Sequence, residues 1–178
     1  MSTALRPQRS DNDLVTIGEL NQLDQEAFVR TVGWIFEDSA WVAERAWDAH
    51  PFDSLDALHR AMVEQVERAT FAESLALLKA HPDLGSRARL SHASTAEQAG
   101  AGLDSLTPSE FERLHRLNAA YRSRFGFPFL LAVKGSTKVD ILQALEARME
   151  ARAEDEFREA LRQVYRIARF RLEELITS

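Results

Sequence analysis

Apolar residues recur at every third or fourth position along most of the chain, which is the periodicity of one face of an α-helix. The pattern is clearest near the end, where one apolar stripe predicts a long helix over about 154–176. The same spacing predicts seven earlier helices. They cover, approximately, residues 25–35, 39–50, 55–66, 71–80, 94–101, 108–125 and 138–149.

Capping residues mark the predicted starts of several of these helices. Thr70 followed by Glu73 has the spacing of a capping box, in which side chain and backbone satisfy each other. The run 107–110, Thr-Pro-Ser-Glu, adds a proline at the first helical position, where the missing N–H costs nothing. Ser94 followed by Glu97 has the same spacing, so it predicts a capping box at the start of a short helix.

The stretch FPFLLAV, residues 127–133, is the one segment with any strand character. It lacks the alternation of a half-buried strand, and no other segment offers it a pairing partner. We therefore predict an extended or partly helical buried connector. Together with the helical pattern, this predicts an all-α fold, a single-domain helical bundle of about seven to nine helices.

Composition sets the class of protein. The chain has 178 residues, 45% of them hydrophobic and 28% charged, and neither a repeat nor a linker divides it. We expect one globular domain over residues 16–178, preceded by a flexible polar tail over residues 1–15. The tail has no apolar core, so it does not resemble a signal peptide, and no apolar run is long enough to cross a membrane.

Charge and cysteine content exclude several functions. The net charge of −6 argues against binding to nucleic acid or to an anionic membrane, because phosphate binding needs clustered Lys and Arg. The absence of cysteine excludes disulfides, thiolate metal sites and thiol nucleophiles, and is consistent with a cytoplasmic location.

Arg171 breaks the apolar stripe of the last predicted helix. At 100° per residue it lies within about 50° of the centre of the stripe, so it faces the core. A guanidinium there is costly unless it is paired or binds an anion. The pattern leaves two interpretations open: a structural ion pair or a side chain reaching the surface, and an anion or carbonyl clamp in a central pocket.

His81 ends a predicted apolar helix and precedes Pro82, which disfavours helical backbone at the histidine. The negative end of the helix dipole would favour a protonated ring. A histidine that only caps the last carbonyls and a general acid–base group are both compatible with this position.

The Ser94–Gln98 segment is open to the same two interpretations, as a helix cap or as part of a site. A metal site is not indicated, because no two histidines stand four residues apart beside an acid. There is also no glycine-rich phosphate loop and no nucleophile elbow. Any chemistry would be cofactor-free acid–base work by His, Glu and Arg.

Four motifs together resemble one known family. HPDL at 81–84, STAEQAGAGL at 94–103, LNAAY at 117–121 and FGFPF at 125–129 occur in the order and spacing of the OHCU decarboxylases, named for 2-oxo-4-hydroxy-4-carboxy-5-ureidoimidazoline (OHCU). The block 28–47 and the ending IARFRLEEL at 167–175 are also similar to this family. The resemblance extends over nearly the whole chain from about Leu20.

The resemblance implies an all-helical enzyme that converts OHCU to (S)-allantoin and CO2 in urate catabolism, without metal or organic cofactor. It implies a catalytic role for His81, Glu97 and Arg171. It also implies a homodimer. Its substrate-contacting positions, largely through backbone groups, correspond here to Pro82, Ser94, Thr95, Ala96, Gln98, Phe129, Leu130, Leu131, Ala132 and Val133.

Two other functions stay open at this point. The chain could be a non-catalytic helical interaction module, with Arg171 in an ion pair and the Ser94–Glu97 pair only a cap. It could also be a metal-dependent hydrolase acting on a ureide, in which case EDTA would abolish its activity.

Overall fold

The computed structural model describes residues 14–86 and 92–177. Within this part the fold is helical, as the periodicity predicts, with one 3-10 turn and a pair of two-residue strands. The elements in chain order are β1 (Val15–Thr16), α1 (Ile17–Leu20), α2 (Gln25–Val32), α3 (Trp41–Ala46), the 3-10 turn η1 (Trp47–Ala49), α4 (Leu55–Glu67), α5 (Phe71–Ala80), α6 (His92–Gly100), α7 (Pro108–Phe125), α8 (Lys138–Arg148), α9 (Ala153–Leu175) and β2 (Ile176–Thr177).

Local capping explains where most helices begin. Asp24 and Ser54 each accept a hydrogen bond from a backbone N–H of the first turn. Thr70, Thr107 and Thr137 form complete capping boxes with the acid three residues later. These interactions involve residues close in sequence, which is why the starts of these helices were predictable.

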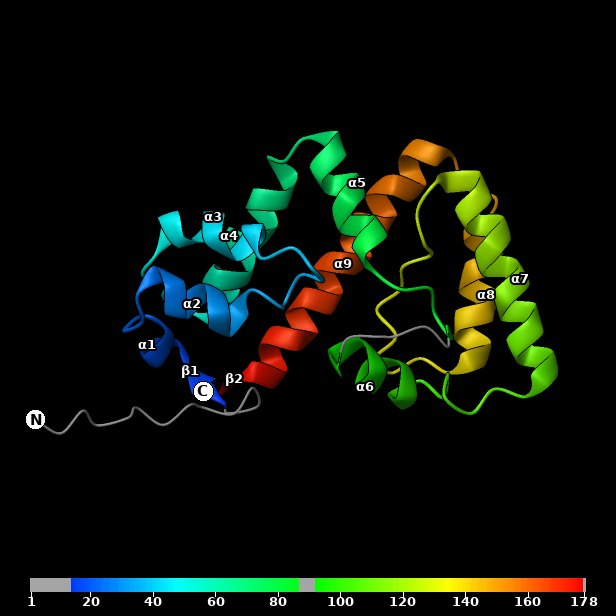
Figure 1. The fold of residues 1–178 in the computed structure, drawn as a ribbon, viewed down its shortest axis with the longest axis horizontal. Helices are drawn as coiled ribbons and strands as arrows, with labels where there is room; N and C mark the ends of the chain where they lie inside the picture. The colour runs from blue at the N-terminus through cyan, green and yellow to red at the C-terminus, as the bar shows by residue number, and fades with distance from the viewer. Residues whose placement is uncertain (1–13, 87–91, 178) are drawn as a thin grey trace, which may run out of the picture.

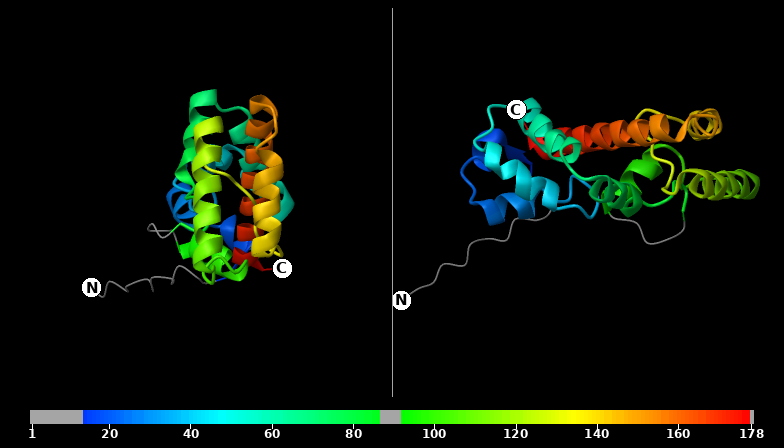
Figure 2. Two further views of the ribbon diagram at one scale, coloured as in Figure 1. Left: turned by 90° about the vertical axis from the view of Figure 1, so that its right-hand side faces the viewer. Right: turned by 90° about the horizontal axis from the view of Figure 1, so that it is seen from above.

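Helix α9 is the element around which the others are arranged. It runs along most of the molecule, with α1 to α4 packed at its C-terminal half and α7 and α8 beside its N-terminal half (Figures 1 and 2). Helices α4, α5 and α7 all contact it. The inward-facing side chains of α9 are therefore held by a single helix that the other helices surround.

The strands β1 and β2 were not predicted. Val15 pairs in parallel with Ile176, and Thr16 with Thr177, so the two ends of the described chain lie side by side (Figure 1). The pairing joins residues far apart in sequence and is only two residues long, so it leaves no period-two pattern. Of the predicted tail, residues 1–13 lie outside the described residues, and Val15 is buried in β1.

The connector 127–133 is neither helix nor strand, and every residue of it except Leu131 is buried. It begins after Gly126, whose φ of 82° ends α7 in the left-handed conformation that glycine adopts without strain. The rings of Phe127 and Phe129 pack edge-on against Tyr121 of α7. This packing fixes the connector across the molecule, close to α9.

Helix α2 is shorter than predicted, because it ends at Val32 and Ile35 lies outside it. The carbonyl groups of Trp34 and Ile35 are thus released from helical hydrogen bonding and can accept bonds from elsewhere. Among the described residues, no helix has the length and apolar character needed to cross a membrane.

Candidate active site

His81 lies at the C-terminal end of α5, where its extended backbone (φ −76°, ψ 140°) ends the helix before Pro82. The side chain is only 5% exposed. Its Nδ1 lies 2.9 Å from the carbonyl oxygen of Leu77. Because a carbonyl only accepts, Nδ1 carries the hydrogen, which leaves Nε2 as the unprotonated nitrogen of the neutral ring. His81 is one of the residues that line a pocket.

Burial lowers the pKa of His81, because the charged ring loses its hydration. The carbonyl of Leu77 and the carboxylate of Glu37 act in the opposite direction but do not outweigh it. Desolvation is the largest influence on this pKa, so the net shift favours the neutral ring. A neutral imidazole with a fixed tautomer is suited to accept a proton through Nε2.

Arg171 projects from the C-terminal part of α9 into the interior, and its side chain is 2% exposed. Its Nε lies 2.6 Å from Oε1 of Glu97, and its Nη2 lies 3.1 Å from Oε2 of the same carboxylate. This is a two-pronged ion pair, the geometry in which arginine binds a carboxylate most strongly. Burial would lower the pKa of Arg171, but Glu97 and Glu37 together raise it.

Glu37 is a member of the site that the sequence analysis missed. It lies between α2 and α3, its side chain is 7% exposed, and its Oε2 lies 2.9 Å from Nη2 of Arg171. A carboxylate directly after the buried residues Ile35 and Phe36 was the available signal. Its partner is distant in sequence, so the pattern alone did not reveal the pair.

Ser94 does not cap α6, so the predicted capping box is wrong. The helix begins at His92, which places Ser94 inside it. The hydroxyl instead donates to Oε2 of Glu37 at 3.1 Å and accepts from Nη2 of Arg171 at 3.4 Å. Ser94 and Glu97 are three residues apart, so they share one face of α6 and both meet Arg171.

Gln98 organises the chain just after His81. Its side-chain oxygen accepts a hydrogen bond of 2.8 Å from the backbone N–H of Gly85. Glycine is suited to this turn because its φ is 70°. The neighbours Thr95 and Ala96 are exposed on α6 and do not line the pocket.

Polar side chains that the sequence analysis also missed form hydrogen bonds with the backbone of the connector. Gln163 of α9 accepts a hydrogen bond of 3.0 Å from the N–H of Ala132. Arg148 of α8 donates to the carbonyl of Leu130 at 2.6 Å and to buried Glu156 at 2.8 Å. Leu130 thereby has a fixed backbone in the wall of the pocket.

One pocket brings most of the predicted site residues together. It takes its lining from the segment that follows α5, from α6, from the connector and from α9. Its volume is only about 20 Å³, enough for roughly one water molecule. Phe129 and Ala132 are buried but do not line it. The lining residues are His81, Pro82, Leu84, Ser94, Glu97, Gln98, Leu130, Leu131, Val133, Ile167 and Arg171.

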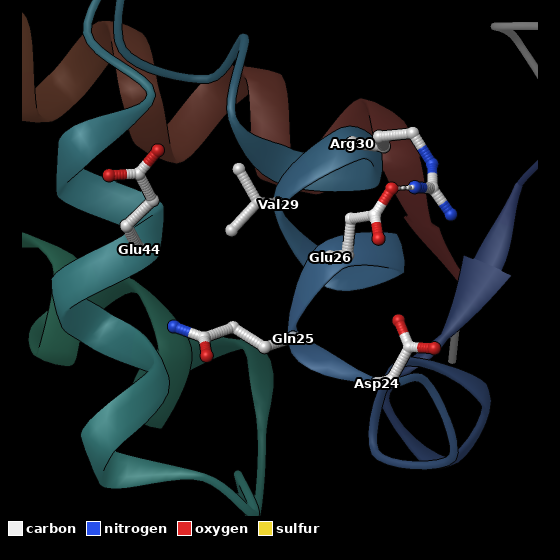
Figure 3. Close-up of a pocket in the computed structure, with 6 residues that line it drawn as sticks. All are labelled: Asp24, Gln25, Glu26, Val29, Arg30 and Glu44. Carbon is white, nitrogen blue, oxygen red and sulfur yellow. Dashed lines mark hydrogen bonds and ion pairs between the residues drawn. The ribbon is translucent and has the colours of Figure 1, made fainter.

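A second hollow lies beside α2 and α3 (Figure 3). It is larger, about 500 Å³, but it is an open depression on the surface. Glu26 and Arg30, an exposed ion pair, point along its rim rather than into an enclosed space (Figure 3). It lacks the convergent buried polar groups of the first pocket, so it is not a comparable candidate.

Within residues 14–86 and 92–177, no group of three or more His, Asp or Glu side chains is placed to hold a metal ion. The titratable and charged side chains that line the described pocket are the imidazole of His81, the carboxylate of Glu97 and the guanidinium of Arg171. Such groups can move a proton and stabilise charge on an oxygen or nitrogen atom.

Comparisons with known proteins show which sequences and structures the chain is similar to. Residues 21–173 match the family model described as OHCU decarboxylase. The chain is 48% identical to the 2-oxo-4-hydroxy-4-carboxy-5-ureidoimidazoline decarboxylase of Haloferax volcanii, over 92% of this chain and 98% of that protein. It is 49% identical to the uric acid degradation bifunctional protein PucL of Bacillus subtilis, over 92% of this chain but 33% of that longer protein.

Two solved structures have a fold similar to that of this chain. The fold matches a crystal structure of (S)-allantoin synthase with a TM-score of 0.76 and 36% identity, covering 91% of this chain and 54% of that one. It also matches a crystal structure of OHCU decarboxylase in the presence of (S)-allantoin, with a TM-score of 0.67, over 86% of this chain and 98% of that one. At 24% identity, the second match concerns the fold alone.

Proposed function

Because the chain belongs to the OHCU decarboxylase family, we propose that it removes CO2 from OHCU and forms (S)-allantoin, a step of urate degradation. The observation that supports this best is the convergence on one pocket of His81, at the end of α5, Glu97 of α6 and Arg171 of α9. The chain spans about a third of the length of the bifunctional Bacillus subtilis relative, so the proposal concerns the chemistry of this pocket only.

The reaction can proceed without a cofactor because the substrate contains its own electron sink. The bond between the ring carbon and its carboxylate breaks, and the electron pair forms a double bond to the neighbouring carbon that bears the ureido group. The electrons of the adjacent C=N bond move onto the ring nitrogen, which takes up a proton. The resulting enol loses its hydroxyl proton and gains one at the ureido-bearing carbon, so one proton is consumed overall.

His81 is the general acid–base group of this scheme. With its hydrogen held on Nδ1 by Leu77, the neutral ring presents Nε2 as the atom that accepts the hydroxyl proton. The protonated ring can then return that proton. The depressed pKa of His81 favours the neutral form at which the cycle begins.

Arg171 stabilises the negative charge that develops on the ring. A tight clamp on the departing carboxylate would stabilise the substrate more than the transition state and would slow the reaction, so the guanidinium belongs on the ring side. Glu97 orients the substrate by accepting hydrogen bonds from its hydroxyl and N–H groups, and relays the proton to the ureido-bearing carbon.

The connector supplies fixed backbone groups to read the edges of the ring. Arg148 and Gln163 hold the backbone at Leu130 and Ala132, which supports a fixed spacing of the connector's amide and carbonyl groups. The substrate-binding role of residues 129–133, of Pro82 and of 94–98 stays part of the proposal. So do the homodimer, the cytoplasmic location and the single domain over 16–178.

A direct test measures the release of the carboxylate carbon of OHCU as CO2. Generate OHCU carrying 13C in its carboxylate from urate with urate oxidase and hydroxyisourate hydrolase, then add the purified chain and record 13C NMR spectra. We expect faster appearance of labelled CO2 and bicarbonate, unaffected by EDTA. Loss of labelled CO2 in EDTA would contradict a reaction without a metal, and release at the spontaneous rate would support the interaction module.

A further inference from the structure

Two carboxylates meet the guanidinium of Arg171, and their surroundings differ. Glu97 lies on α6 and its side chain is 27% exposed, so it has water beside it and room to turn. Glu37 is 7% exposed and accepts a second hydrogen bond from Ser94. A carboxylate so enclosed pays a large desolvation cost if it leaves its cationic partner.

Every nitrogen of the guanidinium is already occupied in this structure. Nε and Nη2 meet Glu97, and Nη2 also meets Glu37 and Ser94. Nη1 lies 3.4 Å and 3.3 Å from the carbonyl oxygens of Trp34 and Ile35. A substrate oxygen can therefore receive a hydrogen bond from Arg171 only when an existing partner moves away.

Glu97 is the partner that can move. The carbonyl groups belong to the backbone, and Glu37 is enclosed, whereas Glu97 is partly exposed in the wall of a pocket too small for the substrate. Its departure would free Nε and one N–H of Nη2, and would enlarge the pocket on the side of α6. The freed carboxylate would then face the substrate's own hydrogen-bond donors.

We propose that Glu37 is a positioning residue, the permanent counter-ion of Arg171, which stays paired while Glu97 exchanges its place on the guanidinium for the substrate. The proposal rests on the proposed function. It assigns different tasks to the two carboxylates: Glu97 acts on the substrate, and Glu37 acts through Arg171.

The permanent pair explains how a buried arginine can serve a decarboxylation. A guanidinium without a counter-ion would attract the substrate's carboxylate, stabilise the bound substrate and raise the barrier to loss of CO2. With Glu37 in place, the net charge of the pair is close to zero. The guanidinium then acts as an oriented hydrogen-bond donor to ring atoms, and its attraction for the carboxylate is weakened.

The variant Glu37→Gln tests this, since it keeps the shape and an acceptor oxygen but removes the charge. Calorimetry measures the binding of two ligands: hydantoin-5-acetate, whose acetate group is anionic, and (S)-allantoin, which is neutral. Steady-state kinetics are measured on the same variant. We expect the anion to bind at least about tenfold more tightly and allantoin to change less than about threefold. We expect kcat to fall at least about tenfold without a rise in KM.

The neighbouring variant Asp38→Asn is the matched control. It removes the same charge from an exposed side chain, and asparagine tolerates the φ of 42° found there. We expect this variant to keep the wild-type preference between the two ligands. An equal change in affinity for both ligands in Glu37→Gln, or wild-type kcat and KM, would overturn the proposal.

The wild-type protein gives a second test that needs no variant to fold. In a crystal structure with (S)-allantoin bound, Nη2 of Arg171 should keep its contact with Glu37 while Nε loses its contact with Glu97. Departure of Glu37, or retention of both carboxylates, would refute the exchange. The calorimetric binding of the two ligands and the crystal structure do not depend on turnover. If the wild-type protein fails to decarboxylate OHCU, the proposed function is refuted. The role of Glu37 is then decided by the calorimetry and the crystal structure.

Discussion

Nε of Arg171 lies 2.6 Å from Oε1 of Glu97, although 74 residues separate them in the sequence. The pair joins the C-terminal part of α9 to one face of α6, in the wall of the pocket that His81 also lines. The structural ion pair raised by the sequence is present, and the same side chain lines a pocket, so the alternative of an anion or carbonyl clamp stays a prediction. An ion pair in the wall of a pocket can be functional if a ligand can replace one partner.

Replacing Arg171 by lysine should preserve folding and impair turnover. Lysine keeps a positive charge beside Glu37, but it lacks the planar fork that meets two oxygen atoms. We expect kcat/KM to fall at least about 10²-fold, the scale for a lost charge-stabilising donor, with a modest change in melting temperature. Arg171→Ala is a less informative variant, because it would leave Glu37 buried without this partner, at a cost of about 3–5 kcal/mol.

The control for this variant is Arg166→Lys, which changes an exposed arginine on the same helix. It should keep wild-type kinetics. Wild-type turnover by Arg171→Lys would remove the guanidinium's geometry from the mechanism.

The acid limb of the pH–rate profile should report His81. The ring must be neutral to accept a proton, and burial lowers its pKa from the usual value of 6.5. We expect kcat/KM to be constant near neutral pH and to fall with an apparent pKa below 6.5. A limb at or above that value would contradict the assignment of His81 as a buried, neutral base.

The same shift predicts a dependence of folding stability on pH. The unfolded chain binds a proton at His81 near pH 6.5, whereas the folded chain resists it until a lower pH. This contribution to stability is therefore complete above about pH 6.5 and is lost as the pH falls towards the folded-state pKa. Urea denaturation at several pH values should show a smaller loss of stability on acidification in His81→Asn than in the wild type.

Ser94→Ala and Thr107→Ala separate a site residue from a helix cap. Thr107 caps α7 through the N–H of Glu110, so its loss should cost about 1 kcal/mol of unfolding free energy and leave turnover unchanged. Ser94 lies inside α6 between Glu37 and Arg171, so its loss should reduce kcat by about tenfold. If Ser94→Ala is less stable but keeps the wild-type kcat, the hydroxyl has no part in aligning the guanidinium of Arg171.

Gln163→Leu tests the support behind the connector. It leaves the buried N–H of Ala132 without its acceptor, which should cost about 1–3 kcal/mol of unfolding free energy. Because the connector forms a pocket wall, we also expect a higher KM for OHCU. Gln143→Leu, on the exposed face of α8, should change neither quantity. A destabilised variant with unchanged KM would show that the connector does not position substrate.

The sequence predicted most of what is local and little of what is distant. Thr70, Thr107 and the arginine in the apolar stripe of α9 are visible because their signals lie within a few residues. Glu37, Gln163 and the pairing of β1 with β2 depend on partners far along the chain, which no local pattern records. Ser94 was misread because the spacing of a capping box also places two side chains on one helical face.

The most direct measurement of the central claim is the initial rate at which optically active allantoin forms from freshly generated OHCU, followed by circular dichroism. The wild-type chain and the control His115→Asn, an exposed histidine, should produce (S)-allantoin rapidly, and His81→Asn should lose at least about 10²-fold of that rate. Racemic product at the spontaneous rate with the wild-type chain, or full activity in His81→Asn, would contradict the account.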